Sequence, residues 1–373
     1  MRIGVPREIK NHEYRIGLVP STVRELCGRG HEVFVENDAG KAIGLTNDRY
    51  EAAGATILPA AAAVFERSEM IVKVKEPQVN ERAMLRDDHL LFTYLHLAPD
   101  PDQTRDLVDS GATCIAYETV TDAHGRLPLL APMSEVAGRL SIQAGAWCME
   151  KAHGGSGTLL GGVPGVAPAK VVVIGGGVVG FNATQMAAGL GARVVVLDRD
   201  LDTLRRLDAL FQSRIETVFS DVDTIEHHVT TADLVIGAVL IPGAAAPKLV
   251  NREHIARMHD GAVVVDVAID QGGCFETSHA TTHDDPTFIV AGVVHYCVAN
   301  MPGAVARTST FSLNAATQPF VLALADKGAR QAMLDNPHLS NGLNVYNGMV
   351  TCGEVASALD YDYTPASEAL KGG

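Results

Sequence analysis

The segment Val171–Gly180 constrains the fold of this chain more than any other. It is a run of β-branched residues that enters a Gly-x-Gly-x-x-Gly turn at Gly175, Gly177 and Gly180. In a strand–turn–helix unit, the first glycine makes the tight turn and the second lets the backbone approach a pyrophosphate. The third lets the helix pack closely on the strand, and the free N–H groups at the start of the helix favour phosphate. The segment therefore predicts dinucleotide binding.

A carboxylate stands where such a unit needs one. The next expected strand, Arg193–Leu197, ends in Asp198, eighteen residues after Gly180. A carboxylate in this position can accept hydrogen bonds from both ribose hydroxyls, and it repels a 2′-phosphate. We therefore expect NAD rather than NADP. Arg199 is adjacent and could accept a phosphate, but we interpret it as a solvated charge at a strand end. A purely structural turn would leave Asp198 unexplained.

Short β-branched runs alternate with helical stretches along most of the chain. This pattern is typical of α/β proteins with parallel sheets covered on both faces, and it predicts two doubly wound, Rossmann-like domains. The expected strands are Ile3–Pro6, Glu32–Glu36, Ala55–Leu58, Ile71–Lys75, Leu90–Leu95 and Cys114–Glu118, then Lys170–Ile174, Arg193–Leu197, Leu234–Val239, Ala262–Val267 and, more weakly, Phe288–Val290. The expected helices include Ser21–Arg29, Asp102–Ser110, Ser134–His153 and Thr308–Lys327.

The length of 373 residues exceeds what one hydrophobic core usually organises. We expect a catalytic domain that begins with residues 1–130 and a dinucleotide-binding domain at residues 131–305. After Pro302 the alternation stops, and we expect only helices in residues 306–373. These helices would return to the first sheet, so the catalytic domain would be discontinuous.

Composition excludes several classes of protein. The 30 Lys and Arg residues against 44 Asp and Glu residues give a net charge of −14, which repels nucleic acids and anionic lipid surfaces. The longest weakly polar run, Leu234–Pro247, is too short and broken to span a bilayer. Six widely spaced cysteines without a C-x-x-C pair indicate reduced thiols and no metal site. The chain begins without an apolar signal segment, so we expect a cytoplasmic protein.

Three basic side chains in the first domain lie at or beyond the ends of expected strands: Arg15, Lys75 and His96. Each has an ordinary structural interpretation, as a loop ion pair, a cap or a satisfied polar group. Together they suit a small carboxylate substrate, because cations hold the carboxylate and an imidazole can move a proton near neutral pH. Asp270 leaves another expected strand into a Gly-Gly turn, and either a turn-forming or a site role fits it.

These segments together resemble the alanine dehydrogenase family along essentially the whole chain. Besides Arg15, the resemblance is carried by Arg2–Glu8, Val72–Pro77, Leu95–Ala98, Leu129–Gly138, Gly161–Gly165, Gly237–Leu240, Asp266–Gly273 and Val298–Pro302. It implies NAD-dependent, reversible oxidative deamination of L-alanine to pyruvate and ammonium by hydride transfer. It also implies a homo-oligomer, commonly a hexamer.

The resemblance also implies roles for individual residues. His96 and Asp270 would be catalytic, and Arg15 and Lys75 would bind the substrate. The implied cofactor contacts are Ser134, Gly175, Gly177, Val178, Val179, Gly180, Asp198, Ser220, Val239, Leu240, Val267, Ile269, Asp270, Val298, Asn300 and Met301. Thr203 and His279 stand where some relatives have a basic residue near the cofactor.

Two other functions fit parts of this pattern. The NAD-binding component of a proton-translocating transhydrogenase would pass hydride to a partner's nucleotide and would need no catalytic group. Another amino-acid dehydrogenase, such as a saccharopine dehydrogenase, would need a pocket for a longer dicarboxylate substrate. The combination of Lys75, His96 and Asp270 favours the alanine dehydrogenase over the transhydrogenase component.

Overall fold

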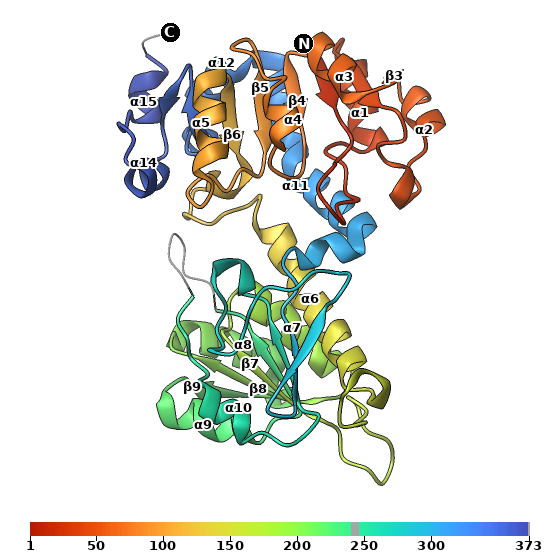
Figure 1. The fold of residues 1–373 in the computed structure, drawn as a ribbon, viewed down its shortest axis with the longest axis vertical. Coiled ribbons are helices and arrows are strands. Elements are labelled where there is room, and N and C mark those ends of the chain that lie inside the picture. Colours follow the sequence, from red (N-terminus) through yellow and green to blue (C-terminus); the bar gives the residue numbers. More distant parts are fainter. Residues whose placement is uncertain (240–245, 372–373) are drawn as a thin grey trace. The chain divides into compact units, whose positions relative to one another are not determined.

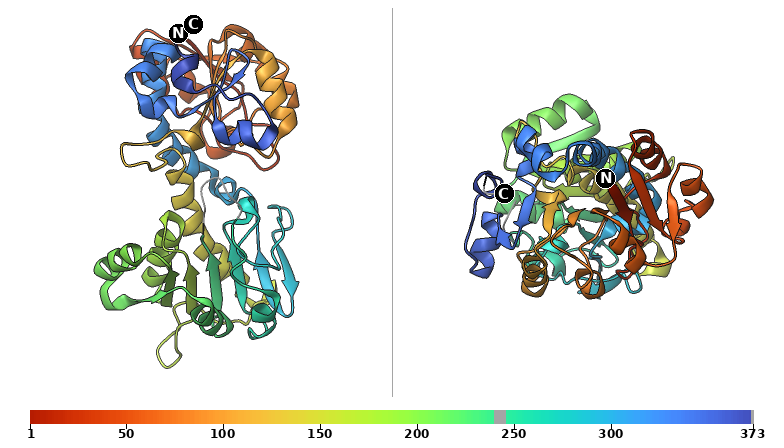
Figure 2. Two further views of the ribbon diagram at one scale, coloured as in Figure 1. Left: turned by 90° about the vertical axis from the view of Figure 1, so that its left-hand side faces the viewer. Right: turned by 90° about the horizontal axis from the view of Figure 1, so that it is seen from above.

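The computed structural model describes residues 1–239 and 246–371, and the chain forms two compact units. Unit 1 is built from Met1–Met133 and Val305–Gly373, and unit 2 from Ser134–Ala304. Each unit contains one sheet flanked by helices (Figure 1, Figure 2). The expected α/β class with two Rossmann-like units is confirmed, although both sheets carry antiparallel strands at an edge.

The sheet of unit 1 has the order β15-β14-β6-β5-β4-β1-β2-β3. Its strands are β1 (Arg2–Val5), β2 (Glu32–Glu36), β3 (Thr56–Leu58), β4 (Met70–Val72), β5 (Leu90–Thr93), β6 (Thr113–Ala116), β14 (Leu343–Tyr346) and β15 (Met349–Val350). Strands β1 to β6 pair in parallel, whereas β14 runs antiparallel to both β6 and β15. The expectation that only helices follow Pro302 is therefore wrong. Asn347 and Gly348 have φ of 48° and 79°, which is the backbone of a two-residue hairpin turn, and the Asn-Gly pair signals it.

Helices cover the sheet of unit 1. They are α1 (Pro20–Gly28), α2 (Asn47–Glu51), α3 (Ala61–Arg67), α4 (Val79–Arg82), α5 (Pro101–Ser110), α11 (Ala306–Lys327), α12 (Ala329–Asp335), α13 (Pro337–Ser340), α14 (Gly353–Leu359) and α15 (Ala366–Ala369). Local signals set some of their ends. Asp100 accepts a hydrogen bond from the Gln103 N–H at the start of α5, and Gly111 at φ 70° ends it. The boundary between the units falls within α6 (Ala131–Cys148).

The sheet of unit 2 has the order β12-β13-β11-β10-β7-β8-β9. Its strands are β7 (Lys170–Ile174), β8 (Arg193–Asp198), β9 (Ile215–Phe219), β10 (Leu234–Gly237), β11 (Val263–Asp266), β12 (Thr287–Val290) and β13 (Val293–Tyr296). Strands β9 and β13 were not among those expected. β9 is a partly exposed edge strand with polar residues, and β13 contains a histidine, so neither is a continuous apolar run.

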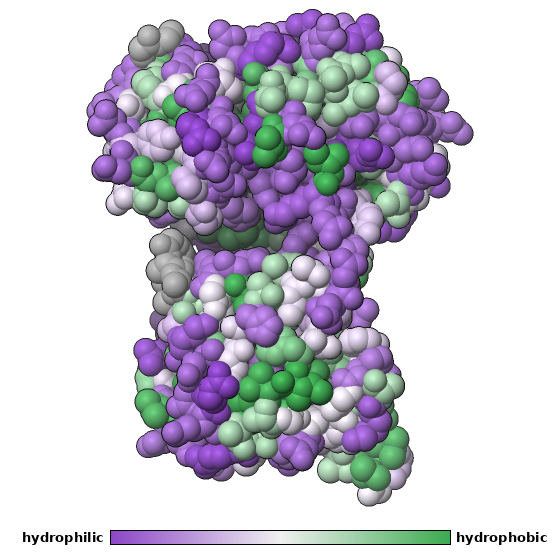
Figure 3. All heavy atoms as spheres, viewed as in Figure 1, coloured by the Kyte–Doolittle hydropathy of each residue, from purple (hydrophilic) through white to green (hydrophobic). Residues whose placement is uncertain are grey.

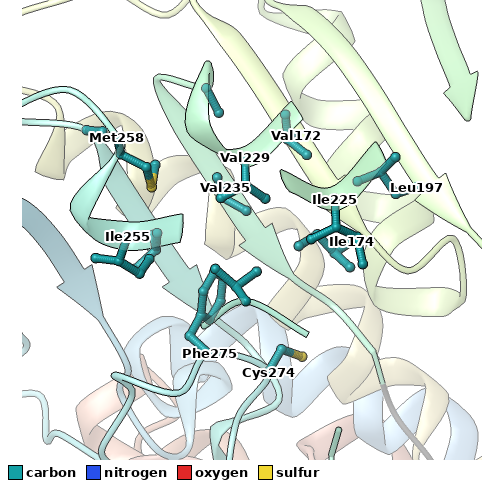
Figure 4. Close-up of a cluster of buried hydrophobic side chains, with 14 of the residues drawn as sticks. Val172, Ile174, Leu197, Ile225, Val229, Val235, Ile255, Met258, Cys274 and Phe275 are labelled. Carbon is teal, nitrogen blue, oxygen red and sulfur yellow. The ribbon is translucent and has the colours of Figure 1, made fainter. Parts of the chain in front are cut away.

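Valine- and isoleucine-rich strands form the core of unit 2. Side chains of β7, β8 and β10 pack with those of α9 (Val222–Thr230) and α10 (Arg252–Ala256) around the fully buried ring of Phe275 (Figure 4). The other helices of this unit are α7 (Val178–Gly189), α8 (Leu201–Phe211) and the part of α6 from Ser134 onward. This buried core fixes the carboxyl ends of the strands, from which the candidate site residues emerge.

Both sheets change winding direction next to a central strand. In unit 1 the chain adds β2 and β3 on one side of β1, then β4, β5 and β6 on the other. In unit 2 it adds β8 and β9 on one side of β7, then β10, β11 and β13 on the other. Open α/β sheets bind ligands beyond the carboxyl ends of the strands at such switch points. We therefore expect ligand sites beyond the carboxyl ends of the pairs β1/β4 and β7/β10.

The surface is mixed in character. Hydrophilic residues cover most of the face of unit 1 in Figure 3, whereas hydrophobic residues gather in patches on unit 2. In the loop before β7, the side chains of Leu159, Val163 and Val166 are 63%, 54% and 65% exposed. Within residues 1–239 and 246–371, no helix is long and apolar enough to cross a membrane.

Candidate active site

The basic side chains expected at the substrate lie beyond β1, β4 and β5 in unit 1. The expected strands Ile71–Lys75 and Leu90–Leu95 were too long, since β4 ends at Val72 and β5 at Thr93. Strand β4 ends early because the Glu8 carboxylate accepts the N–H groups of Val74 at 2.7 Å and Lys75 at 3.3 Å. Lys75 and His96 therefore lie in loops at the carboxyl edge of the sheet.

Arg15 is buried in the loop after β1 and is held by Glu13. Its Nε and Nη2 atoms donate to the two Glu13 carboxylate oxygens at 2.7 and 2.6 Å, and Nη1 lies 3.0 Å from the Met133 sulfur. Burial alone would lower the pKa of Arg15, but the hydrogen bonds and charge of Glu13 raise it. The guanidinium is thus a permanently charged group in a fixed orientation.

Lys73 is completely buried between two carboxylates. Its ammonium lies 3.1 Å from Glu8 and 2.7 Å from Glu81, and all three side chains are almost inaccessible to solvent. Burial acts to lower the pKa of Lys73, but the two negative charges outweigh it and raise the pKa. The charge of Lys73 is therefore compensated within the protein, and its ion pairs stabilise the loop that begins after β4.

Lys75, two residues further on, is different. Its N–H donates to Glu8, and its carbonyl accepts a hydrogen bond from the Thr93 hydroxyl at 3.0 Å. Its half-buried side chain forms no hydrogen bond or ion pair with any residue that the structure describes. Burial acts to raise the pKa of the neighbouring Glu76, but the charges of Lys75 and Lys10 lower it. The backbone of Lys75 is thus held on both sides while its ammonium stays available for a ligand.

His96 extends from the loop after β5, and its side chain is 49% exposed. Its ring stacks on that of Tyr94, with centroids 6.0 Å apart and planes at 9°. The Tyr94 hydroxyl donates to the Leu129 carbonyl at 2.5 Å, and burial raises the pKa of Tyr94, so this ring is neutral. The structure thus places an accessible imidazole on a fixed aromatic support.

Sequence reasoning missed the carboxylates that support these cations, namely Glu8, Glu13 and Glu118. Glu118 had a usable signal, because the expected strand Cys114–Glu118 ends in it just as the preceding strand runs into a histidine. In the structure β6 ends at Ala116, and Glu118 lies in the 3-10 turn η2 (Tyr117–Thr119). The partners of Glu8 are 65 or more residues away, and no local pattern reveals them.

The glycine turn of unit 2 fits a dinucleotide. Gly175 follows β7 with φ of 99°, and a Cβ atom on Gly180 would lie 1.7 Å from the Gly175 carbonyl oxygen. No described atom lies within 4 Å of the place where a Cβ would stand on Gly177, which precedes the first turn of α7. The backbone is therefore open at this point, as close approach of a pyrophosphate requires.

Asp198, at the end of β8, is tied to this turn. One carboxylate oxygen accepts the Gly176 N–H at 2.6 Å and the other accepts the Asp200 N–H at 2.8 Å. A carboxylate has about four acceptor sites, so both oxygens can still bind ribose hydroxyls. Arg206 donates to the Gly176 carbonyl at 3.2 Å. The turn is thus held from β8 and from α8.

The other expected cofactor contacts also lie near the carboxyl edge of this sheet. Two of them, Val178 and Val179, begin α7, and Ser134 lies in α6. The others follow strands of the sheet: Ser220 follows β9, Val239 follows β10, Val267, Ile269 and Asp270 follow β11, and Val298, Asn300 and Met301 follow β13. Leu240 lies outside the described residues. Thr203 and His279 have structural contacts, since Thr203 donates to the Asp200 carboxylate and His279 stacks on Phe288.

Asp270 is exposed in the 3-10 turn η5 (Ile269–Gln271). The loop that carries it is closed by Asp266, whose carboxylate accepts the N–H groups of Cys274 and Phe275 at 3.2 and 3.3 Å. Lys248 donates to the carbonyls of Gly272 and Phe275 in the same loop. Among the described residues, no three His, Cys, Asp or Glu side chains are grouped so that they could hold a metal ion.

The close contact at Gly180 generates a prediction. Replacing Gly180 with Ala forces a methyl group against the Gly175 carbonyl, which is backbone and cannot move away cheaply. We expect the free energy of unfolding to fall by about 1–3 kcal/mol, as for an overpacked core. Gly189→Ala in the same helix is the control, because its Cβ would meet open space. Urea unfolding measures both, and equal stability of the two variants would contradict the tight turn.

The two lysines after β4 generate a second prediction. Lys73→Met leaves Glu8 and Glu81 buried without a counter-charge, and such a change costs about 3–5 kcal/mol. Lys75→Met removes a side chain with no such partners, so it should change stability by less than about 0.5 kcal/mol. Both are measured by denaturant unfolding, and a Lys73→Met protein as stable as Lys75→Met would refute the pairing.

Known proteins resemble this chain over its whole length. A family model described as "Alanine dehydrogenase/PNT, N-terminal domain" matches residues 4–137, and "Alanine dehydrogenase/PNT, C-terminal domain" matches residues 141–353. An alanine dehydrogenase from Halomonas elongata is 58% identical over 370 residues, which are 99% of this chain and 100% of that protein. A solved L-alanine dehydrogenase structure is 50% identical with a TM-score of 0.94, covering 96% of this chain and 99% of that one.

A transhydrogenase structure from Sinorhizobium meliloti has a TM-score of 0.82 at 23% identity, covering 94% of this chain and 100% of that one. This likeness shows a shared fold alone. The matches to both domain models and the identity over nearly the full length are decisive: the chain belongs to the alanine dehydrogenase/PNT family.

Proposed function

We propose that this protein is an NAD-dependent alanine dehydrogenase, an oxidoreductase that converts L-alanine to pyruvate and ammonium and also catalyses the reverse reaction. The observation that carries the proposal is the 58% identity over 99% of the chain to a protein named alanine dehydrogenase. The presence of Arg15, Lys75 and His96 at the carboxyl edge of one sheet supports it. The transhydrogenase alternative has only a likeness of fold at 23% identity.

We propose unit 1 as the catalytic domain. The charged, fixed guanidinium of Arg15 would hold the substrate carboxylate, and the available ammonium of Lys75 would contact the carbonyl oxygen of pyruvate. Charge-assisted hydrogen bonds of this kind are stronger than neutral ones and orient a small substrate. Because Glu13 and Glu8 fix the guanidinium and the Lys75 backbone, little freedom would be lost when the substrate binds.

We propose unit 2 as the NAD-binding domain. The open backbone at Gly177 and the first N–H groups of α7 would hold the pyrophosphate, and Asp198 would accept the ribose hydroxyls. A bound nicotinamide would supply the acceptor for the hydride that leaves the Cα atom of alanine, and the protein would contribute its placement. The remaining contacts inferred from the resemblance, including Asp270 as the second catalytic residue, are part of this proposal.

His96 would move the protons. Loss of a hydride from Cα, with release of one ammonium proton to solvent, leaves an iminium, to which water adds while His96 accepts the proton that the water releases. His96 returns this proton to the nitrogen of the resulting carbinolamine. Ammonia then leaves as His96 takes the proton of the carbinol hydroxyl and pyruvate forms. An accessible imidazole with one face on a fixed ring suits this work, because it can reach a ligand without losing its orientation.

We also propose that the protein acts in the cytoplasm as a homo-oligomer, with six copies as the resemblance implies. The exposed apolar side chains of Leu159, Val163 and Val166 support association, since one loop rarely leaves so much apolar surface in water. Alanine, pyruvate and ammonium would be its small-molecule partners.

The direct test of the function is NADH formation with L-alanine and with a panel of other amino acids. We expect alanine to be used best, and His96→Ala to reduce turnover by about 10²–10⁴-fold because the proton carrier is lost. His124→Ala is the control, since this exposed histidine also lies in unit 1. Strong preference for a different amino acid would overturn the substrate, and full activity of His96→Ala would overturn the role of His96.

Asp198 predicts cofactor preference. The wild-type enzyme should use NAD much better than NADP, because the carboxylate would face a 2′-phosphate. Asp198→Ala removes both this repulsion and the bond to Gly176, so it should weaken NAD use and narrow the ratio of kcat/KM between the two cofactors. Asp202→Ala, an exposed change nearby in α8, should leave the ratio unaltered. Equal use of both cofactors by the wild type would refute the assignment.

A further inference from the structure

Glu118 reaches from the end of β6 to the loop that carries His96. Strands β5 and β6 are parallel neighbours, with Thr93 opposite Ala116, so the residues after them lie side by side. One Glu118 carboxylate oxygen accepts the N–H of His96 at 2.6 Å and that of Leu95 at 3.0 Å, and the other lies 3.2 Å from the Leu95 nitrogen. The carboxylate thus binds two consecutive backbone N–H groups.

These bonds hold an unusual backbone conformation. His96 has φ of 51°, in the left-handed region that residues other than glycine rarely adopt. Such a conformation persists only where its surroundings fix it. The two charge-assisted bonds to Glu118 and the Tyr94 ring provide that fixation. The direction of the imidazole therefore depends on Glu118.

The same carboxylate faces the ring itself. The Nδ1 atom of His96 lies 3.8 Å from a Glu118 oxygen, within ion-pair distance when the imidazole is protonated. Glu118 is only 15% exposed, so solvent weakens the attraction less than on an open surface. The other supporting carboxylates are occupied, because Glu13 pairs with Arg15 and Glu8 with Lys73. In the described part of the chain, His96 is the one ion-pair partner of Glu118.

We propose that Glu118 is a positioning residue for the reaction and acts through His96. It fixes the backbone that directs the imidazole, and its charge stabilises the imidazolium that forms when His96 takes the proton from the attacking water. Neither bond making nor bond breaking involves Glu118 itself. This inference rests on the proposed role of His96 as proton carrier.

The substitution Glu118→Gln removes the negative charge but keeps an oxygen that can accept the backbone hydrogen bonds. The glutamine side-chain oxygen can still accept the N–H groups of Leu95 and His96, so stability should be near that of the wild type. We expect kcat with alanine to fall roughly twofold to fivefold, the upper part of the range for losing one ion pair. The KM for alanine should change less than twofold, because Arg15 and Lys75 are untouched.

Glu150→Gln is the matched control. Glu150 lies 3.6 Å from the Nδ1 atom of His153 in unit 2, a carboxylate–histidine pair with similar spacing and no role in the proposed chemistry. This variant should keep the wild-type kcat and KM. A loss of kcat equal to that of Glu118→Gln would show a general effect of reduced negative charge and would overturn the proposal.

The decisive measurement is a double-mutant cycle with His96→Ala. If Glu118 acts through His96, Glu118→Gln should change kcat by less than twofold once the imidazole is gone. Equal losses with and without His96, or wild-type kcat in Glu118→Gln, would overturn the inference. Failure of the proposed function would look different, because the wild type would then oxidise another amino acid better than alanine. The same cycle run with that substrate would still test Glu118.

Discussion

The structure depends on a change of winding direction beside one central strand in each sheet. Because the chain leaves β1 toward one side and returns to β4 on the other, the loops after these strands diverge at the carboxyl edge. Arg15 and Lys75 lie on those loops, and the corresponding loops of unit 2, after β7 and β10, carry the glycine turn and Val239. The same constraint of parallel topology thus places both sets of candidate site residues.

In unit 1 this arrangement places several cationic side chains on neighbouring loops, and buried carboxylates compensate the charge of those that are buried. Two lysines that lie two residues apart illustrate this. The ammonium of Lys73 is paired with Glu8 and Glu81, whereas Lys75 has only its backbone held by Glu8 and its ammonium is left available. A buried cation without partners would lose its charge or destabilise the fold. The carboxylates therefore belong to the site, although we expect none of Glu8, Glu13 or Glu118 to touch the substrate.

The parts of the site that depend on local sequence could be predicted, and those that depend on distant partners could not. Strand β7 was predicted with its observed bounds, because four consecutive β-branched apolar residues after Lys170, followed by glycines, are typical of a buried strand that ends in a tight turn. The ends of β4 and β5 were misplaced because the side chains of Glu8 and Glu118 capture the N–H groups there. Strands β14 and β15 were missed because the Asn347-Gly348 turn was overlooked between short, partly polar runs.

The proposed roles of the two units differ: unit 2 would hold the dinucleotide, whereas Lys75 and His96 of unit 1 would contact the substrate and carry the proton from water. The most direct test is to measure NADH binding and alanine turnover in one full-length variant, Lys75→Met with His96→Ala. We predict that NADH binds within about twofold of the wild-type affinity, since no group of unit 2 is altered. Turnover should fall by about 10²-fold or more, as expected for loss of the imidazole alone. Loss of NADH binding together with turnover, or turnover that persists, would contradict this division of roles.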